Sequence, residues 1–245
     1  EAAGGYKGQA QAVGVSEDGN YAWVGTENGR IYRIAGLAAA RDYGTADADS
    51  GATAVTVDMV QNLPGRNITS IAVDPNNNDR VLVTCGNYGN SNYVYYSSNA
   101  TSTTANFLVK DGNLGNFPVY AATFDKGNSA YAIIGTEFGI FSTQNINTAS
   151  PQWGADNSGL ARVPVFTLKQ YRTNKCATAD MSVEEGDIFA GTFGRGAFQT
   201  TSLMTTRPIG IAEQEVEEAE EAVKLFPNPA EDFTTLALEL PAGNY

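Results

Sequence analysis

The sequence contains no histidine, and this absence removes several kinds of chemistry at once. Without histidine the chain cannot form a Ser-His-Asp or Cys-His triad, a histidine-ligated zinc site, or a histidine acid–base pair. Only two cysteines are present, Cys85 and Cys176, so a cysteine-rich metal site is excluded and at most one internal disulfide is possible. We expect both to be free thiols, because the repeats described below separate them by a whole sheet. Any catalysis would therefore depend on carboxylates, tyrosine or lysine.

Charged residues are scarce, and their balance is acidic. They make up 17% of the chain, and 15 Lys and Arg against 27 Asp and Glu give a net charge of −12. This balance argues against nucleic acids and anionic membranes as partners, because both bind basic surfaces. No hydrophobic run approaches the length of about 18 residues that a membrane helix requires, so we expect no integral membrane segment.

Glycine and hydrophobic residues, by contrast, are plentiful. The chain has 245 residues, of which 26 are glycine and 42% are hydrophobic. The hydrophobic content predicts a folded core. The many glycines and asparagines favour short strands joined by tight turns over long helices, so we expect an all-β fold.

A repeated pattern organises most of the chain. A Gly-Thr pair recurs at Gly25, Gly135 and Gly191, with the variant Cys85-Gly86 between them, at intervals of about 50 to 60 residues. Each copy follows an apolar strand and leads into a strand with an aromatic residue, and another strand with a polar turn precedes it. Glycine at such turns supplies positive φ. We assign a structural role in these turns to Gly25, Thr26, Gly29, Gly135, Thr136, Gly139, Gly191, Thr192, Gly194, Arg195 and Gly196.

The repeat unit therefore reads strand, polar turn, strand, glycine turn, strand and a fourth outer strand, which is typical of a β-propeller blade. We predict about four blades in residues 1–207. Because four blades are near the lower limit of ring closure, we expect them to be the C-terminal part of a six- to eight-bladed ring. The start at Glu1, without methionine or a signal-peptide pattern, agrees with this expectation. A compact ring closed by this segment alone is the alternative.

The last part of the chain differs in composition. Residues 208–222 form a predicted acidic linker, with six glutamates among the nine residues 213–221, because a block of like charge repels itself and stays extended. Residues 223–245 turn apolar, and Leu236, Leu238 and Leu240 alternate as on one face of a strand. One strand is not a domain, so we interpret this segment as a truncated C-terminal domain.

The segment Leu225-Phe-Pro-Asn-Pro-Ala230, followed by that alternating strand, resembles the start of the type A C-terminal sorting domain of the bacterial type IX secretion system. The resemblance implies a β-sandwich sorting domain, export through the periplasm of a Gram-negative bacterium, and a secreted or cell-surface protein. It also implies that the type IX secretion machinery in the outer membrane is a partner. The later strands of that domain are not in the sequence. The implied secretion signal comprises Leu225, Phe226, Pro227, Asn228, Pro229 and Ala230.

The blades resemble sortilin-like propellers of the Asp-box type. The likeness rests on Ile68-Thr-Ser-Ile-Ala-Val-Asp-Pro75, Tyr93-Val-Tyr-Tyr-Ser-Ser98 and Gly191-Thr-Phe-Gly-Arg-Gly196. The Asp-box turn itself, Ser-x-Asp-x-Gly-x-x-Trp, is degenerate, because Asn99 and Gln144 stand where its aspartate would be. The resemblance implies the fold and says little about activity.

Three segments allow a binding role beside a structural one. Gly25–Gly29 could cradle a phosphate, but it lacks the lysine and the following helix of a P-loop, so we interpret it as a turn. Asp74–Asp79 could bind a structural calcium ion, but it lacks EF-hand spacing, so a capped turn is the main interpretation and we expect no cofactor. Arg195 could clamp an anion, although we expect it to pack or to form hydrogen bonds between blades.

Aromatic and acidic residues suggest further candidates. Tyr93, Tyr95 and Tyr96 could form a sugar-stacking platform, but strand alternation divides them between two faces, so we expect blade packing. Glu184-Glu185 and the pair Asp74 and Asp125 could serve as glycosidase carboxylates, although nothing in the sequence fixes their separation.

The sequence thus leaves three functions open. The first is a non-enzymatic scaffold that binds an extracellular protein or glycan. The second is a propeller-type glycoside hydrolase, which rests on analogy of fold alone. The third is a structural adhesin or filament component in which the blades act as a spacer. The lack of a recognisable acid pair favours the first.

Overall fold

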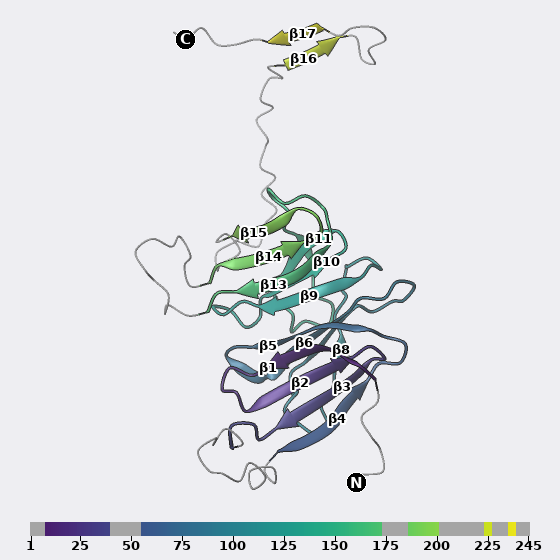
Figure 1. Cartoon of the computed structure of the whole chain (residues 1–245), viewed down its shortest axis with the longest axis vertical. Helices are drawn as coiled ribbons and strands as arrows, with labels where there is room; N and C mark the ends of the chain where they lie inside the picture. The colour runs from purple at the N-terminus through teal and green to yellow at the C-terminus, as the bar shows by residue number, and fades with distance from the viewer. Residues whose placement is uncertain (1–7, 40–54, 173–185, 201–222, 227–234, 239–245) are drawn as a thin grey trace, which may run out of the picture. The chain divides into compact units, whose positions relative to one another are not determined.

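The computed structural model describes residues 8–39, 55–172, 186–200, 223–226 and 235–238 (Figure 1). Within these ranges every regular element is a β-strand, every strand pairing is antiparallel and no α-helix occurs. The predicted all-β class is therefore confirmed. A search of the same ranges for a helix long and apolar enough to cross a membrane finds none. The chain divides into two compact units, residues 1–206 and residues 207–245.

Four sheets of the first unit correspond to the four predicted blades. Blade 1 consists of β1 (Ala10–Val15), β2 (Tyr21–Thr26), β3 (Arg30–Ala35) and β4 (Thr56–Asn62). Blade 2 consists of β5 (Ile68–Asp74), β6 (Asn77–Cys85), β7 (Val94–Ser97) and β8 (Leu108–Val109). Blade 3 consists of β9 (Val119–Phe124), β10 (Ala132–Thr136), β11 (Gly139–Thr143) and β12 (Gly154–Ala155). Blade 4, in the part that the structure describes, consists of β13 (Val165–Gln170), β14 (Ile188–Thr192) and β15 (Gly196–Thr200).

The strand order is the same in each blade and follows the chain from an inner to an outer strand. The inner strands β1, β5, β9 and β13 lie beside one another in that order, so successive blades are arranged around a shared axis. In Figure 1, β9 and β13 form the upper side of this arrangement, and β1 and β5 form the lower side. The second strand of blade 3 is fully buried: every residue of β10 is buried, as its apolar sequence Ala-Ile-Ile-Gly-Thr predicts for a strand covered on both faces.

The hydrophobic core lies between the blades. One cluster of buried side chains fills the interfaces of blades 1, 2 and 3, and a second joins blades 3 and 4 through residues such as Ile133, Val165 and Ile188. Both tryptophans reach blade 2 from a neighbouring blade: the indole N–H of Trp23 donates to the carbonyl of Ala100 at 3.3 Å, and that of Trp153 donates to the carbonyl of Lys110 at 2.9 Å. Adjacent blades are thus joined by apolar burial and by satisfied indole donors.

The recurring Gly-Thr glycine has a different role from the predicted one. Gly25, Gly135 and Gly191 lie inside β2, β10 and β14, and their φ angles are not positive, so they are not turn residues. A Cβ atom on Gly25 would lie 2.3 Å from Cγ2 of Ile68, and one on Gly135 would lie 2.7 Å from the carbonyl oxygen of Val165. These glycines therefore allow the inner strand of the following blade to approach closely.

The remaining turn glycines agree with the prediction. Gly29, Gly139, Gly194 and Gly196 have φ angles of 83°, 101°, 73° and 80°, a region that glycine adopts without steric cost. The threonine of each pair, Thr26, Thr136 and Thr192, closes its turn by donating its hydroxyl to a backbone carbonyl at the start of the next strand.

The polar turns between first and second strands connect neighbouring blades. In blades 1, 2 and 3 this turn contains an aspartate that caps its own backbone and also accepts a hydrogen bond from a side chain of the next blade. The contacts are Asn78 Nδ2 to Asp18 Oδ2 at 2.8 Å, Ser129 Oγ to Asp74 Oδ1 at 3.0 Å, and Gln170 Nε2 to Asp125 Oδ1 at 2.9 Å. The acidic turns are therefore structural links between blades.

The second unit contains one antiparallel pair, β16 (Val223–Phe226) and β17 (Thr235–Leu238). The sequence predicted a single strand in this segment, around the alternating leucines. The structure adds β16, whose residues Leu225 and Phe226 pair with Leu236 and Thr235. The remaining signal residues, Pro227, Asn228, Pro229 and Ala230, and the predicted linker lie outside the described residues.

Candidate ligand-binding cleft

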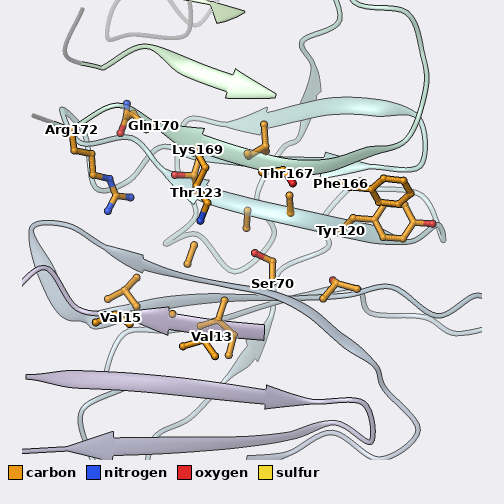
Figure 2. Close-up of a pocket in the computed structure, with 18 residues that line it drawn as sticks. Val13, Val15, Ser70, Tyr120, Thr123, Phe166, Thr167, Lys169, Gln170 and Arg172 are labelled. Atoms are coloured by element: carbon orange, nitrogen blue, oxygen red, sulfur yellow. The ribbon is translucent and has the colours of Figure 1, made fainter. Parts of the chain in front are cut away.

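A cleft of about 400 Å³ lies between the four inner strands (Figure 2). It is lined by short runs of residues from β1, β5, β9 and β13 and by Arg172 just beyond β13. Its volume falls within the range of about 300 to 1,000 Å³ that is typical of ligand pockets. Because all four blades contribute, the cleft is a property of their arrangement around the axis.

The cleft is walled by the edges of sheets. Consecutive residues line it, for example Thr69–Val73 of β5 and Phe166–Gln170 of β13, whereas a strand that presented one face would contribute every second residue. Within the described residues, each inner strand pairs with a neighbour on one side only, and no backbone hydrogen bond joins two inner strands. Backbone N–H and C=O groups of four strands therefore face the cleft.

One end of the cleft is aromatic. The rings of Tyr120 and Phe166 have centroids 4.8 Å apart, and Phe166 lies 6.0 Å from the exposed Phe193. The Tyr120 hydroxyl donates to Glu137 Oε2 at 2.5 Å. Burial, together with the hydrogen bond to Glu137, raises the pKa of Tyr120 well above its usual value, so this hydroxyl stays protonated. The aromatic end thus offers apolar surface and a protonated hydroxyl that is bound to Glu137.

The other end of the cleft is cationic. Lys169 is exposed on β13, and Arg172 lies beyond the end of that strand with its Nη1 3.7 Å from Glu17 Oε2, across the opening between blades 4 and 1. Figure 2 shows Lys169, Gln170 and Arg172 at the end opposite Tyr120 and Phe166. The Lys126 amine donates to the carbonyl of Arg172 at 2.7 Å, which fixes the backbone there. In a chain of net charge −12, this end would attract anionic groups.

Carboxylates do not line the cleft among the described residues. The lining between the two ends consists of small apolar residues and hydroxyls, including Ser70, Thr123 and Thr167. Asp74 and Asp125 are 0% and 1% exposed, and both are engaged in the links between turns. Glu184 and Glu185 lie outside the described residues. The cleft therefore holds no pair of carboxylates of the kind that glycoside hydrolysis requires.

Other candidates from the sequence have structural roles where they are described. Tyr93, Tyr95 and Tyr96 are buried between blades, as expected from strand alternation. In the Asp74–Asp79 turn, Asp74 accepts from the backbone of Asn76 and from Ser129, and Asp79 accepts from the backbone and hydroxyl of Thr101. A search of the described residues for clusters of three or more metal-ligating side chains finds none.

Arg195 is placed differently from its interpretation, whereas Cys85 and the Gly25–Gly29 turn agree with theirs. Arg195 is exposed in the turn between β14 and β15, and it does not lie in the cleft. Cys85 is a buried free cysteine, whereas Cys176 lies outside the described residues. The Gly25–Gly29 segment is the β2–β3 turn, with no helix after it.

Comparison with solved structures shows the fold. The β-propeller domain of Cps50 (Swd1) from Myceliophteria thermophila superposes with a TM-score of 0.54 and 11% identity, over 83% of this chain and 56% of that one. The chain has a β-propeller fold. It spans little more than half of the Swd1 propeller domain, and at this identity the likeness concerns the fold alone. The total number of blades in the ring stays a prediction.

Two further structures are similar at lower scores. The computationally designed Ika4 protein matches 80% of this chain and 93% of that one, with a TM-score of 0.48 and 14% identity. An ancestral GH74 enzyme matches 79% of this chain and 23% of that one, with a TM-score of 0.48 and 16% identity. No family model matches the sequence, and no curated protein matches it.

The residues of the cleft were not singled out by the sequence. Tyr120, Phe166, Lys169 and Arg172 lie in or beside strands that the sequence predicted, but they follow no motif. Because the cleft is formed by strand edges, residues that line it do not alternate, and periodicity gives no signal for them. Only the strand order around the axis brings them together.

Proposed function

We propose that this protein is a secreted or cell-surface β-propeller, exported by the type IX secretion system, that binds an extracellular ligand in the cleft between its inner strands. The observation that carries the binding role is the lining of the cleft. The cleft has an aromatic end, hydroxyl groups in its middle and a cationic end. Apolar surface with a few polar groups that point to the same space is typical of a ligand-binding site.

The same lining supports binding over hydrolysis. Glycoside hydrolases use two carboxylates that flank the scissile bond. The described residues of the cleft include no Asp or Glu, and the buried Asp74 and Asp125 hold neighbouring turns together. A hydrolytic role of this segment is therefore not proposed. A spacer role would not require a cleft that is lined by aromatic, hydroxyl and cationic groups.

The export route is supported by the tail. Leu225-Phe-Pro-Asn-Pro-Ala230 resembles the start of a type A sorting domain, and it belongs to the compact unit that begins at Arg207. A tail that is a separate unit is suited to act as a secretion signal, which the secretion machinery binds while the blades bind the ligand. The acidic, lysine-poor composition of the chain is also compatible with an extracellular protein.

The binding role can be tested by filling the cleft. Thr167 is exposed and lines it, so Thr167→Trp should project an indole into the cleft and leave the fold intact. Thr103→Trp is the matched control, since Thr103 is exposed in a blade 2 loop outside the cleft. The full chain would be screened on arrays of short peptides and of extracellular glycans.

Signals that Thr167→Trp removes and Thr103→Trp retains are the expected result, with unchanged circular dichroism for both variants. If the bound molecules do not depend on Thr167, the ligand site lies elsewhere. If neither array gives a signal above that of an unrelated protein, the scaffold role of the cleft is wrong.

A further inference from the structure

Among the residues that the structure describes, no strand pairs with the inner edge of β13 in blade 4. β13 pairs with β14 on one side, through registers such as Leu168 with Ala190 and Gln170 with Ile188, and its other edge faces the cleft. An unpaired strand edge is a template for the backbone of another extended chain. Sugars or small molecules could form hydrogen bonds with single N–H or C=O groups of such an edge. Only a polypeptide has N–H and C=O groups at the same spacing along its whole length.

We propose that the ligand of the cleft is an extended peptide segment, which pairs with the free edge of β13 and carries acidic side chains at alternate positions toward Lys169. This proposal rests on the proposed function of the cleft as a ligand site. The peptide would become a new innermost strand of blade 4, so the order would be peptide, β13, β14 and β15.

The charges of the cleft specify the acidic side chains. Lys169 and Arg172 are the charged residues among the described lining, and both are cationic; because Arg172 is already paired with Glu17, Lys169 is the main group for an acidic ligand. Thr167 and Lys169 are two residues apart on β13 and thus lie on the same face of the strand. Opposite charges on neighbouring strands stabilise a sheet, whereas like charges destabilise it. A glutamate or aspartate beside Lys169 is therefore favoured, and a lysine is disfavoured.

The opposite wall of the cleft specifies apolar side chains. Val13 and Val15 of β1 line the cleft and are 60% and 55% exposed, although valine side chains of inner strands such as Val73 and Val165 are buried. Figure 2 shows Val13 and Val15 on β1, across the cleft from β13. Because side chains of an extended peptide alternate in direction, a strand with acidic residues at every second position can place apolar residues between them. Contact with the two valines would remove apolar surface from water.

The dimensions fit a short segment. The cleft-lining run Phe166–Gln170 has a length of about 13 Å at the usual rise of a strand. A strand of four or five residues would match this run, and the cleft volume of about 400 Å³ suits a ligand of this size.

The aromatic end favours a peptide over a glycan. A platform for successive sugar rings needs aromatic rings that present broad parallel faces. The planes of Tyr120 and Phe166 are inclined at 58°, and those of Phe166 and Phe193 are nearly perpendicular at 87°. Such a cluster forms a pocket for one bulky side chain, as aromatic clusters in protein interfaces do.

The test uses synthetic peptides with a fluorescent label and the full chain. The probe is an eight-residue peptide of alternating valine and glutamate, and the comparison peptide alternates valine and lysine. We expect the acidic peptide to bind at least about tenfold more tightly, with an affinity that falls as salt is added. Lys169→Glu should weaken the acidic peptide about tenfold, whereas Arg162→Glu, an exposed charge reversal outside the cleft, should change its affinity less than about twofold.

Backbone pairing is tested separately from charge. In a paired strand only alternate N–H groups point toward the partner. One acidic peptide is therefore N-methylated at every odd residue and a second at every even residue. The peptide whose methyl groups replace the N–H groups that point toward β13 should lose binding, and the other should keep it. Equal loss or equal retention would overturn strand pairing. If glycans bind in a manner that Thr167→Trp abolishes and the acidic peptide does not bind, the peptide proposal is wrong while the proposed function stands. If no ligand of either class binds, both are wrong.

Discussion

At the scale of single residues, buried polar groups hold the loops of this propeller in place. Asp111 lies after β8 and accepts backbone hydrogen bonds from Tyr93 at 2.8 and 2.9 Å and from Val94 at 2.7 Å. Burial raises the pKa of Asp111 above its ordinary value of 3.8, in spite of these hydrogen bonds. Ionisation of Asp111 therefore opposes folding, and this cost decreases as the pH falls from the raised pKa toward 3.8.

The backbone donors that Asp111 satisfies lead to the first prediction. Asp111→Ala would leave the N–H groups of Tyr93 and Val94 without their acceptor, so we expect the free energy of unfolding to fall by about 2 to 4 kcal/mol. Glu27→Ala is the control, because Glu27 is exposed and its backbone N–H, which the substitution keeps, donates to the carbonyl of Gln9. Urea denaturation of both variants measures the difference. Equal stabilities of the two variants would show that water replaces the carboxylate.

A second prediction concerns the buried thiol. Burial raises the pKa of the Cys85 thiol to about 11, and the side chain is 0% exposed. Because only the thiolate reacts, Cys85 in a Cys176→Ser chain should be alkylated by iodoacetamide at pH 8 at least about a hundredfold more slowly in the folded state than in guanidinium chloride. Rapid modification of the folded chain would mean that β6 opens locally.

At the scale of strands, the sequence predicted where most strands lie, but it did not show why the repeated glycines are required. Apolar β-rich runs and polar Asp-Asn turns located the first three strands of each blade, because both signals are local. The outer strands β4, β8 and β12 were expected from the repeat but not placed in the sequence. The Gly-Thr glycines were recognised as a repeat but assigned to turns. For Gly25 and Gly135 the requirement comes from Ile68 and Val165 of the following blade, which lie 43 and 30 residues further along the chain, and no local signal reports such a contact. The cleft was missed for the same reason.

These glycines provide the third prediction, with its control inside the repeat. Gly135→Ala would place a Cβ atom 2.7 Å from the backbone oxygen of Val165, which can move only with β13. We expect a loss of about 1 to 3 kcal/mol in the free energy of unfolding from the resulting strain. At the equivalent Gly191, the nearest atom is Cβ of Thr167 at 3.4 Å, within the same blade. Gly191→Ala should therefore be neutral, or stabilise the chain by up to about 1 kcal/mol.

Thermal melting of the two glycine variants measures this difference. A destabilised Gly191→Ala would indicate that another segment packs against blade 4, and a stable Gly135→Ala would contradict the close approach of blades 3 and 4.

At the scale of the whole molecule, the chain combines blades that share a core with a tail that forms its own unit. Because residues 207–245 form a compact unit by themselves, we expect that the blades do not need the tail for stability. The tail carries the motif that resembles a sorting signal. Stability and export should therefore be separable properties of this protein.

The fourth prediction tests this separation. Deletion of everything from Val223 onward should leave the melting temperature of the blades unchanged within about 2 °C, since the deleted strands belong to a separate compact unit. In a type IX secreting bacterium, the deletion should retain the protein in the periplasm of the cell. Normal export of the shortened protein would refute the sorting role, and a lower melting temperature would show that the tail packs on the blades.

Because both indoles form hydrogen bonds with blade 2, intrinsic tryptophan fluorescence should report on the contacts of that blade. Trp23 and Trp153 are the two tryptophans of the sequence; they are 0% and 5% exposed, and both dock on blade 2. Emission of the native chain should therefore be blue-shifted and shielded from iodide or acrylamide. A red shift would report separation of blade 1 or blade 3 from blade 2, whereas opening of blade 4 or of the tail would be optically silent. An emission trace that precedes the circular dichroism transition would identify blade 2 as the place where unfolding begins.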